Sequence, residues 1–532
     1  MLRHAIGMLV LGVSLLRGLP VYAAETLSEQ ELAKKIDRHL AARWKAERVE
    51  PVSPADDAEY MRRVYLDLIG RIPSLAEARA FLEDRTPDKR ARLVRRLMED
   101  RAHVEHFVNV WRDLLIPEAN NGDPVQGQLN SFNDWLRKQF SQNVPYDRMV
   151  RELLTVPFGS ERVRSRKMTR SEPSDAAAPT PLAFYVAKDA KPENLAASTA
   201  RLFLGVRIEC AQCHNHPFGS WTRQHFWGYA AFFAGLQRAS ADNGGGIREV
   251  FDRRDIKIPG TLVSAEARFL DETEPRWKYN VGARTTLAEW LTAAENPYFA
   301  RATVNRLWAH FFGLGLVEPV DDFRSDNPPS HPELLEELAS QFVAHRFDLR
   351  YLMRSITASR AYQLTSAAPA SSSTPAHLFA HRTVKGLTPE QLFDSLAVAT
   401  GYQPPANPRP MNEPRPDARA EFLARFAGGQ PRSETQRSIQ QALMLMNGRF
   451  IAAATRPKDG AVLASVANDS SLDTVAKVEA LCLAALSRKP TPAEARRFVR
   501  YVDGGAPSQD AKLALADVFW ALLNSAEFSL NH

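Results

Sequence analysis

Two of the three cysteines in this 532-residue sequence lie in a single C-x-x-C-H run, from Cys210 to His214. Two thiols at this spacing can bind one metal ion or bond to one planar cofactor, and the adjoining imidazole is a further metal ligand. With so few cysteines, such a run arises by chance in roughly one such chain in a few thousand. The spacing therefore indicates chemistry at sulfur rather than coincidence.

Three kinds of site are compatible with this run. In the first, which we favour, haem c is attached by thioethers to Cys210 and Cys213, and His214 is the proximal iron ligand. In the second, the two thiolates bind zinc or iron, with His214 and His216 as the candidate histidines. His216 suits that ion better, because His214 adjoins Cys213. In the third, Cys210 and Cys213 form a short disulfide.

A haem also needs a pocket and usually a sixth ligand. His216 is too close in sequence to reach the opposite face of the haem, so the distal candidates are Met168, His225 and His310. The stretch 218–233 is strongly aromatic. It either lines such a pocket or packs as a helix in the core, which is the commoner outcome for aromatic residues at helical spacing.

A second group of polar residues consists of Asp321, Asp322 and His331. These side chains could bind a metal or a sugar, or act as general acid and base. A carbohydrate-acting or hydrolytic surface enzyme would use them in that way. The sequence contains no G-x-S-x-G elbow, P-loop, G-x-G-x-x-G or H-E-x-x-H motif that would specify another reaction. Whether the protein is an enzyme stays open at this stage.

The same second group also has ordinary structural roles, which we favour. Ser330 and Glu333 have the spacing of a capping box that opens a helix. The two aspartates can cap the chain or pair with Arg306 or Arg324. Cys482, the remaining cysteine, lies on an apolar helical face and is expected to be a core residue.

The composition excludes several classes of protein. Hydrophobic residues make up 44% of the chain and charged residues 24%, as in ordinary globular proteins rather than disordered, coiled-coil or collagen-like ones. The formal charge of +6 comes from 68 basic and 62 acidic groups. That excess is too small to indicate binding of nucleic acid.

The first 23 residues have the features of an export signal. A short basic start is followed by an apolar run over residues 5–16, and small residues at 21–23 offer a cleavage site after Ala23. A retained membrane anchor is the alternative, although the run is short for a bilayer. We expect an exported protein of the periplasm or cell surface, without a transmembrane span after cleavage. Its expected partner is an unidentified redox or envelope protein.

Helical periodicity dominates the rest of the sequence. Capping boxes and apolar spacing predict helices at 28–47, 56–69, from 74 onward, at 88–98 with Thr86 as cap, at 136–140, at 147–154 and again from 286. Strand character is confined to 244–279, for example at 249–251 and 261–263. The fold class is therefore mainly α and multi-helical, with a small irregular β-containing insertion near 240–280. Expected divisions are a signal at 1–23, a helical part at 24–161, a linker or loop at 162–181, a Cys/His region at 182–280 and a helical domain at 281–532.

One segment is echoed near the other end of the chain. Residues 71–81 resemble residues 488–498, and each follows an apolar helix, with Tyr65 and Cys482 at matching places. Both segments combine a proline-marked turn with a capping box. Either two helical hairpins converged on the same cap, which we slightly favour, or one hairpin was duplicated.

Several longer motifs resemble known families. The first half is similar to the planctomycete cytochrome C-associated domain of unknown function, and the second half to the planctomycete-specific C-terminal domain of unknown function. The residues that carry the resemblance are 63–73, 145–147, 210–218 and 230–233 in the first half, and 305–313, 315–323 and 329–335 in the second. Asn215 departs from the aspartate that is more usual there. The resemblance implies an exported protein and leaves its biochemistry open.

These observations lead to one expected function and two alternatives. We expect an exported haem- or metal-binding envelope protein that transfers electrons through the C-x-x-C-H site. One alternative is a surface enzyme using Asp321, Asp322 and His331. The other is a non-catalytic binding scaffold in which the cysteines and histidines only staple a loop.

Overall fold

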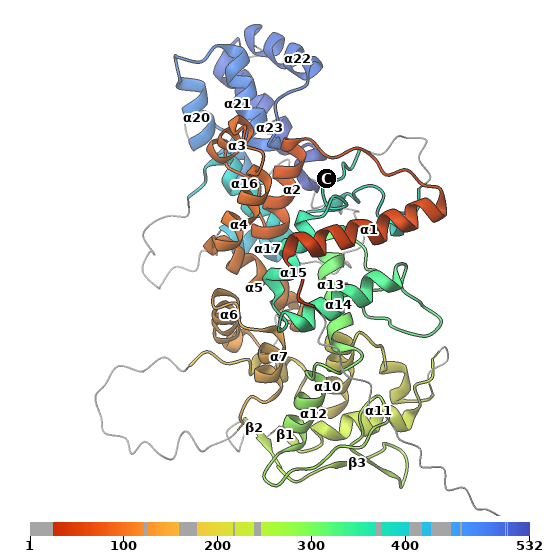
Figure 1. Ribbon diagram of the computed structural model, residues 1–532. Helices are drawn as coiled ribbons and strands as arrows, with labels where there is room; N and C mark the ends of the chain where they lie inside the picture. Colours follow the sequence, from red (N-terminus) through yellow and green to blue (C-terminus); the bar gives the residue numbers. More distant parts are fainter. Residues whose placement is uncertain are drawn as a thin grey trace, which may run out of the picture.

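The structure of the protein is a computed structural model that describes residues 25–121, 125–158, 178–215, 219–238, 246–367, 374–403, 418–426, 448–457, 460–505, 507 and 509–532. Most of the described chain is helical, and the strands form three two-stranded antiparallel sheets, as predicted. In Figure 1, α20 to α23 lie at one end of the molecule, and α11, α12 and the first strands lie at the other. Within the described residues, no helix is long and apolar enough to cross a bilayer.

The first half of the chain contains short helices joined by tight turns. Their bounds are α1 Glu29–Glu47, α2 Asp57–Ile69, α3 Leu75–Glu83, α4 Lys89–Glu99, α5 Arg101–Leu115, α6 Gln126–Ser141, α7 Tyr146–Leu154, α9 Ala183–Ala187, α10 Pro192–Thr199 and α11 Arg223–Ala230. A π-helical turn, Ala200–Leu204, extends α10, and the 3-10 turn η3 covers Glu209–Gln212.

The second half is also helical. Its bounds are α12 Ala283–Leu291, α13 Phe299–Phe312, α14 Pro332–Ala344, α15 Leu349–Ala358, α16 Pro389–Thr400, α17 Ala418–Phe426, α19 Arg449–Ala454, α20 Ala461–Asn468, α21 Thr474–Leu486, α22 Pro492–Asp503 and α23 Ala511–Leu523. The short strands β5, Lys385–Gly386, and β6, Leu530–Asn531, pair with each other beside α2.

The predicted helix starts are confirmed where a capping box is present. Ser28 and Ser74 each accept a hydrogen bond from the backbone N–H three residues on, and Glu31 and Glu77 complete the two boxes. For α4 the sequence predicted Thr86 as the N-cap residue, whereas the N-cap residue is Asp88, two residues later. The Thr86 hydroxyl donates to Asp84 instead, so Asp88 is the residue that precedes the helix.

The strand region lies where the sequence placed it, but its strands are shifted. β1 is Leu236–Arg238 and pairs with β2, Ile247–Glu249, while β3, Asp255–Lys257, pairs with β4, Ser264–Glu266. The predicted strand at 261–263 is wrong: these residues form the β3–β4 turn, because Gly260 adopts φ +74° and Thr261 bonds back to Ile258. Most of the predicted linker, residues 162–177, lies outside the described residues.

Buried apolar side chains form two core clusters. The larger cluster runs from α1 through α15 and so joins both halves of the chain. The smaller cluster lies among α16 to α23, and it also includes Leu66 and Ile72 from the first half. Helix α2 therefore contributes to both cores, which explains why all of its residues from Tyr60 to Ile69 are buried.

The two echoed segments adopt the same local structure. Arg71 donates to both carboxylate oxygens of Glu77, and Arg488 does the same to Glu494, at 2.8 to 3.1 Å in all four bonds. The residue before each arginine, Gly70 or Ser487, has a left-handed backbone with φ 71° or 61°. The correspondence extends beyond the capping box.

It also reaches the start of the preceding helix. Asp56 caps α2 and Asp473 caps α21. Asp56 lies fifteen residues before Arg71, and Asp473 lies fifteen residues before Arg488. Convergence on a favourable capping box would not require the preceding helix and turn to have the same length in both copies. The geometry therefore favours duplication of a helical hairpin over convergence on one cap.

Candidate functional site

Cys210, Cys213 and His214 lie together on an exposed turn at the end of η3. Both cysteines are free thiols in this structure, and neither is part of a disulfide. Ala211, between them, is fully buried and anchors the turn in the core. Two thiols and an imidazole therefore face outward from a turn whose centre is fixed.

The turn is held mainly by α11. The backbone oxygen of Gln212 accepts a hydrogen bond from the Trp227 indole at 3.0 Å and another from Arg223 Nε at 3.4 Å. The backbone N–H of Arg223, at the first turn of α11, donates to the side chain of Asn215 at 3.1 Å. Because Arg223 and Trp227 are one helical turn apart, one face of α11 binds both ends of the cysteine turn.

His214 is oriented by its own backbone neighbour. Its Nδ1 lies 2.8 Å from the carbonyl oxygen of Asn215, so that Nδ1 carries the proton and Nε2 is the lone-pair nitrogen. Histidines that bind a metal usually donate their other ring N–H to a carbonyl or carboxylate in this way. The arrangement therefore presents Nε2 of an exposed imidazole as a ligand atom.

Of the other predicted ligands, His225 and His310 belong to different elements. His216 and Met168 lie outside the described residues. His225 completes the capping box of α11 and lies 3.4 Å from Glu272. His310 is on α13, where its Nε2 bonds to the backbone oxygen of Asp67 at 3.0 Å. Within the described residues, no group of three or more His, Cys, Asp or Glu side chains has the geometry to hold a metal ion.

The aromatic stretch after the motif packs in the core. Phe226, Trp227, Tyr229, Phe232 and Phe233 are all at most 3% exposed. Phe232 stacks on Phe269 with 5.0 Å between ring centres. The core interpretation is therefore confirmed, and any cofactor at the cysteines lies outside this aromatic layer.

Asp321 and Asp322 take the structural roles that we favoured. Asp321 pairs with Arg207, whose Nε lies 2.9 Å from Oδ1, and Asp322 pairs with Arg324 at 3.0 Å. Arg306 was the wrong partner, because its guanidinium donates to the backbone oxygens of residues 201 and 202. Arg207 lies three residues before Cys210, so Asp321 fixes the segment that leads into the cysteine turn.

His331 is buried and separate from the two aspartates. It is 4% exposed, its Nδ1 lies 3.1 Å from the Ser330 hydroxyl, and its ring packs against Phe379. In the described part of the chain, no hydrogen bond or ion pair joins it to Asp321 or Asp322. Burial, and to a lesser extent nearby Arg43, lowers the pKa of His331 to about 4.

The predicted capping box at Ser330 is wrong. Pro332 occupies the first position of α14, and His331 therefore precedes the helix as its N-cap residue. The Ser330 hydroxyl donates to the backbone oxygen of Leu316 at 3.1 Å. Ser330 thus closes a loop rather than capping a helix.

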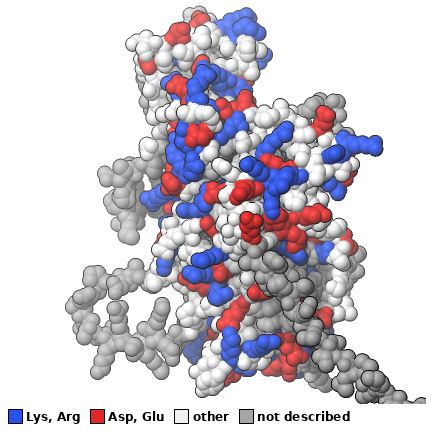
Figure 2. Space-filling model, in the orientation of Figure 1, with Lys and Arg blue, Asp and Glu red and all other residues white. Residues whose placement is uncertain are grey.

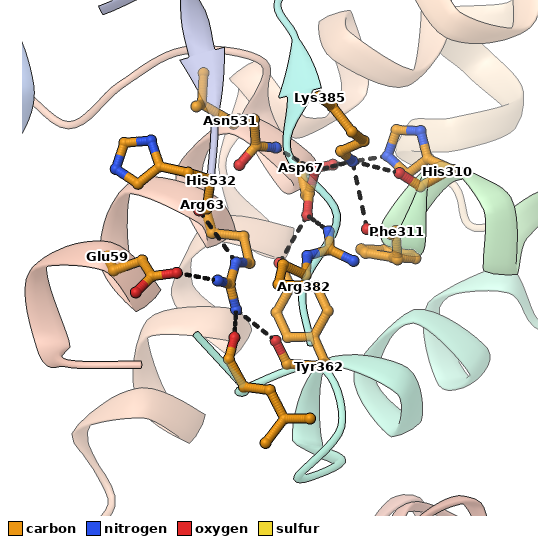
Figure 3. Close-up of polar contacts among 12 residues, drawn as sticks. Glu59, Arg63, Asp67, His310, Phe311, Tyr362, Arg382, Lys385, Asn531 and His532 are labelled. Carbon is orange, nitrogen blue, oxygen red and sulfur yellow. Dashed lines mark hydrogen bonds and ion pairs between the residues drawn. The ribbon is translucent and has the colours of Figure 1, made fainter. Parts of the chain in front are cut away.

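Sequence reasoning missed a buried network centred on Asp67 of α2, drawn in Figure 3. Oδ1 of Asp67 accepts from Lys385 at 2.8 Å and from Asn531 at 2.7 Å. Oδ2 accepts from the Tyr362 hydroxyl at 2.8 Å and from Arg382 at 3.1 Å. Asp67 is 1% exposed and thus joins α2 to three distant segments.

The charges in this network stabilise one another. Burial raises the pKa of Asp67, but Lys385 and Arg382 outweigh burial and lower it to about 2. Arg63, one turn earlier on α2, pairs with Glu59 and donates to the backbone oxygens of Tyr362 and Leu364. The available signal was the presence of charged residues, Arg62, Arg63 and Asp67, within the apolar stretch 60–69 of this helix.

Surface charge gives no single-sign field on the face shown in Figure 2. Lys and Arg side chains alternate with Asp and Glu over the whole described length of this face. Many charged side chains of the described residues form ion pairs, such as Arg92 with Asp88 and Arg301 with Glu336. The charged surface shown is therefore mixed in sign, and ion pairs are common among the described residues.

Comparison with known families divides the chain in two. The family model PSCyt2, described as a protein of unknown function (DUF1549), matches residues 35–238. The family model PSD1, described as a protein of unknown function (DUF1553), matches residues 283–422. No curated protein and no solved structure matches the chain. The cysteine turn and Asp67 lie in the first match, whereas Asp321, His331 and Lys385 lie in the second.

Proposed function

Because this chain belongs to the planctomycete-type proteins in which a PSCyt2 domain precedes a PSD1 domain, both of unknown function, we propose its function from its own residues. The proposal is a haem-binding protein of the cell envelope that carries electrons through the turn at Cys210, Cys213 and His214. One observation carries it: both thiols are free and exposed, and His214 presents Nε2 beside them.

These three residues make up the protein's attachment set for haem c. The thiols of Cys210 and Cys213 would bond to the two vinyl groups, and Nε2 of His214 would bind the iron on one face. When bound, the haem supplies one-electron transfer. The protein would fix its orientation through Gln212 and Asn215, which α11 holds in place.

Zinc or iron bound directly by the thiolates is the second candidate. Two free thiols on one turn are also the beginning of a tetrahedral site. His216 is the predicted third ligand of that ion, because His214 adjoins Cys213. Haem ranks first because the three described residues already complete its attachment set.

Export is part of the same proposal. Covalent haem attachment takes place outside the cytoplasm, and free thiols persist there when a cofactor engages them. We therefore propose that residues 1–23 are removed and that the protein works in the periplasm or at the cell surface. N-terminal sequencing of the protein from its natural host should then begin at or near Ala24; recovery of Met1 from the cytoplasm would contradict export.

The decisive experiment is intact-mass and absorption analysis of protein from a host with haem-attachment machinery. The wild type should carry one covalent haem, with a Soret band that survives denaturation. The double variant with Cys210→Ser and Cys213→Ser should carry no covalent haem. Cys482→Ala is the matched control, because this third cysteine is fully buried in another part of the molecule.

Each other outcome selects a different function. Stoichiometric zinc or iron without haem would support the thiolate metal site. Neither haem nor metal would leave a scaffold, or an enzyme that uses Asp321, Asp322 and His331. Loss of hydrolytic activity in Asp322→Asn with unchanged folding would then identify the enzyme.

A further inference from the structure

The turn between β3 and β4 lies beside the cysteine turn. Helix α11 contacts η3 on one side and both β3 and β4 on another, so it supports the two turns together. The guanidinium of Arg223 donates to the backbone oxygen of Gln212 and also to that of Pro259, in the β3–β4 turn. One arginine side chain therefore separates Pro259 from the residue that precedes Cys213.

The β3–β4 turn has an unusual surface. Leu262, at its tip, is 95% exposed, and Val263 beside it is 55% exposed. The residues Lys257 to Leu262 line a hollow that is largely open to solvent.

The position of the core restricts where a planar cofactor can lie. The aromatic residues behind the cysteine turn are packed against one another and against α10. A macrocycle attached to Cys210 and Cys213 must therefore lie on the outer side of the turn. The β3–β4 turn is the apolar element that Arg223 holds next to that side.

We propose that the β3–β4 turn is the outer wall of the cofactor site, with Leu262 and Val263 against one edge of a covalently attached porphyrin. This inference rests on the proposed function and adds the element that shields the cofactor from water. Lys257, exposed at the base of the hollow, provides a cation for a propionate. Shielding matters because the apolar surroundings of a haem help to set its reduction potential and its accessibility.

The test compares two proteins loaded with haem: the wild type and the double variant that combines Leu262→Ser and Val263→Ser. Covalent haem content should not change, because the thioethers form at the cysteines. The reduction potential should fall, and imidazole should bind to the iron several-fold faster, because water and ligands reach the porphyrin edge. The matched control is Tyr279→Ser, which removes a side chain that is 94% exposed outside this turn.

The outcomes separate this inference from the proposed function. Wild-type protein without haem would overturn both, and that result is obtained before any variant is made. In another outcome the wild type carries haem, and the double variant has the same reduction potential and the same rate of imidazole binding. That result would overturn only the inference about the β3–β4 turn. Leu262→Ser alone keeps the test usable should the double variant fold poorly, and circular dichroism checks the folding of each.

Discussion

Asp321 acts on the cysteine turn from the second domain. Its carboxylate pairs with Arg207, and the backbone N–H of Phe323 donates to Gly205 at 2.9 Å in the same segment. The ring of Phe323 also fills the space where a side chain at Gly205 would lie. Asp321, from the second candidate group, therefore supports the segment that leads into the cysteine turn of the first group.

Replacing Asp321 with Asn should loosen the approach to the cysteine turn. The Arg207 pair is partly exposed, so its loss should cost about 1 kcal/mol or less of global stability. Amide hydrogen exchange over residues 206–213 should nevertheless become faster. Asp322→Asn is the matched control, because its partner Arg324 lies in its own loop. Equal exchange in the two variants would show that Asp321 does not hold the segment.

Buried histidines should make the protein sensitive to mild acid. Burial lowers the pKa of His103 from its ordinary 6.5 to about 4, and it also lowers the pKa of His106 well below 6.5. Between pH 6.5 and about pH 4 these histidines bind protons in the unfolded chain but not in the folded chain. The free energy of unfolding should therefore fall as the pH decreases below about 6.5, by up to about 1.4 kcal/mol per pH unit for each such histidine.

The variant His103→Gln tests this dependence. Urea unfolding at several pH values between 8 and 5 should give a shallower slope for the variant than for the wild type. The comparison concerns slopes, since the variant also alters the 2.8 Å contact between Nδ1 and the Leu68 oxygen. Parallel curves for the variant and the wild type would contradict the assignment.

At the scale of elements, the hairpins α2–α3 and α21–α22 should lose similar stability when the glutamate that binds the arginine is replaced in each. Glu77→Gln and Glu494→Gln each weaken a capping box and a two-bond contact with an arginine. Burial raises the pKa of Glu77, but Arg71 and Ser74 outweigh it and lower the value to about 2. Each variant should lose about 1–2 kcal/mol in urea unfolding.

The exposed glutamate Glu274 provides a control for these two variants. It is 78% exposed and paired only with Arg268, so Glu274→Gln should change stability by less than about 1 kcal/mol. A large loss for one of the two variants and none for the other would show that the two hairpins are not equivalent. That result would favour convergence over duplication.

Local signals predicted the elements better than their contacts. Ser28, Ser74 and the 3.6-residue periodicity involve neighbours within one or two turns, so the sequence contains the whole signal. The β3–β4 turn was predicted as a strand because Leu262 and Val263 are typical strand residues. Their exposure depends on the turn at Gly260, which the local sequence does contain, and on the contact with the distant Arg223, which no local pattern contains.

The candidate site divides in the same way. The C-x-x-C-H run and its neighbour His214 could be identified by spacing alone. The roles of Asp321 and Asp67 could not, because their partners are separated from them by more than one hundred residues. Long-range ion pairs are set by how helices dock, and their only trace in sequence is a charged residue among apolar ones.

At the scale of the whole molecule, Asp67 connects the two family domains and the last strand. It belongs to the segment matched by PSCyt2, whereas Tyr362, Arg382 and Lys385 belong to the segment matched by PSD1. Asn531 of β6 adds a third contact, and Arg63 bonds to the backbone oxygen of His532. Figure 3 shows these side chains converging between α2 and the β5–β6 pair. The domains therefore share this buried polar junction in addition to their common apolar core.

Removing the charge of Asp67 should destabilise the molecule as a whole. Asp67→Asn leaves Arg382 and Lys385 without their buried counter-charge, and breaking a buried pair in this way costs about 3–5 kcal/mol. The wild-type contribution is present above the ordinary pKa of 3.8 and is lost as the pH falls toward about 2. Urea unfolding at pH 7 measures the loss directly.

Asp88→Asn is the matched control, because Asp88 pairs with Arg92 at a side chain that is 57% exposed. Its cost should stay within about 0–1 kcal/mol. Both domains also share the apolar core, so the Asp67 variant should still unfold with coincident transitions in tryptophan fluorescence and circular dichroism. Two separate transitions in the variant would show that the polar junction is what couples the two domains, and a cost equal to that of Asp88→Asn would show that Asp67 does not stabilise the junction.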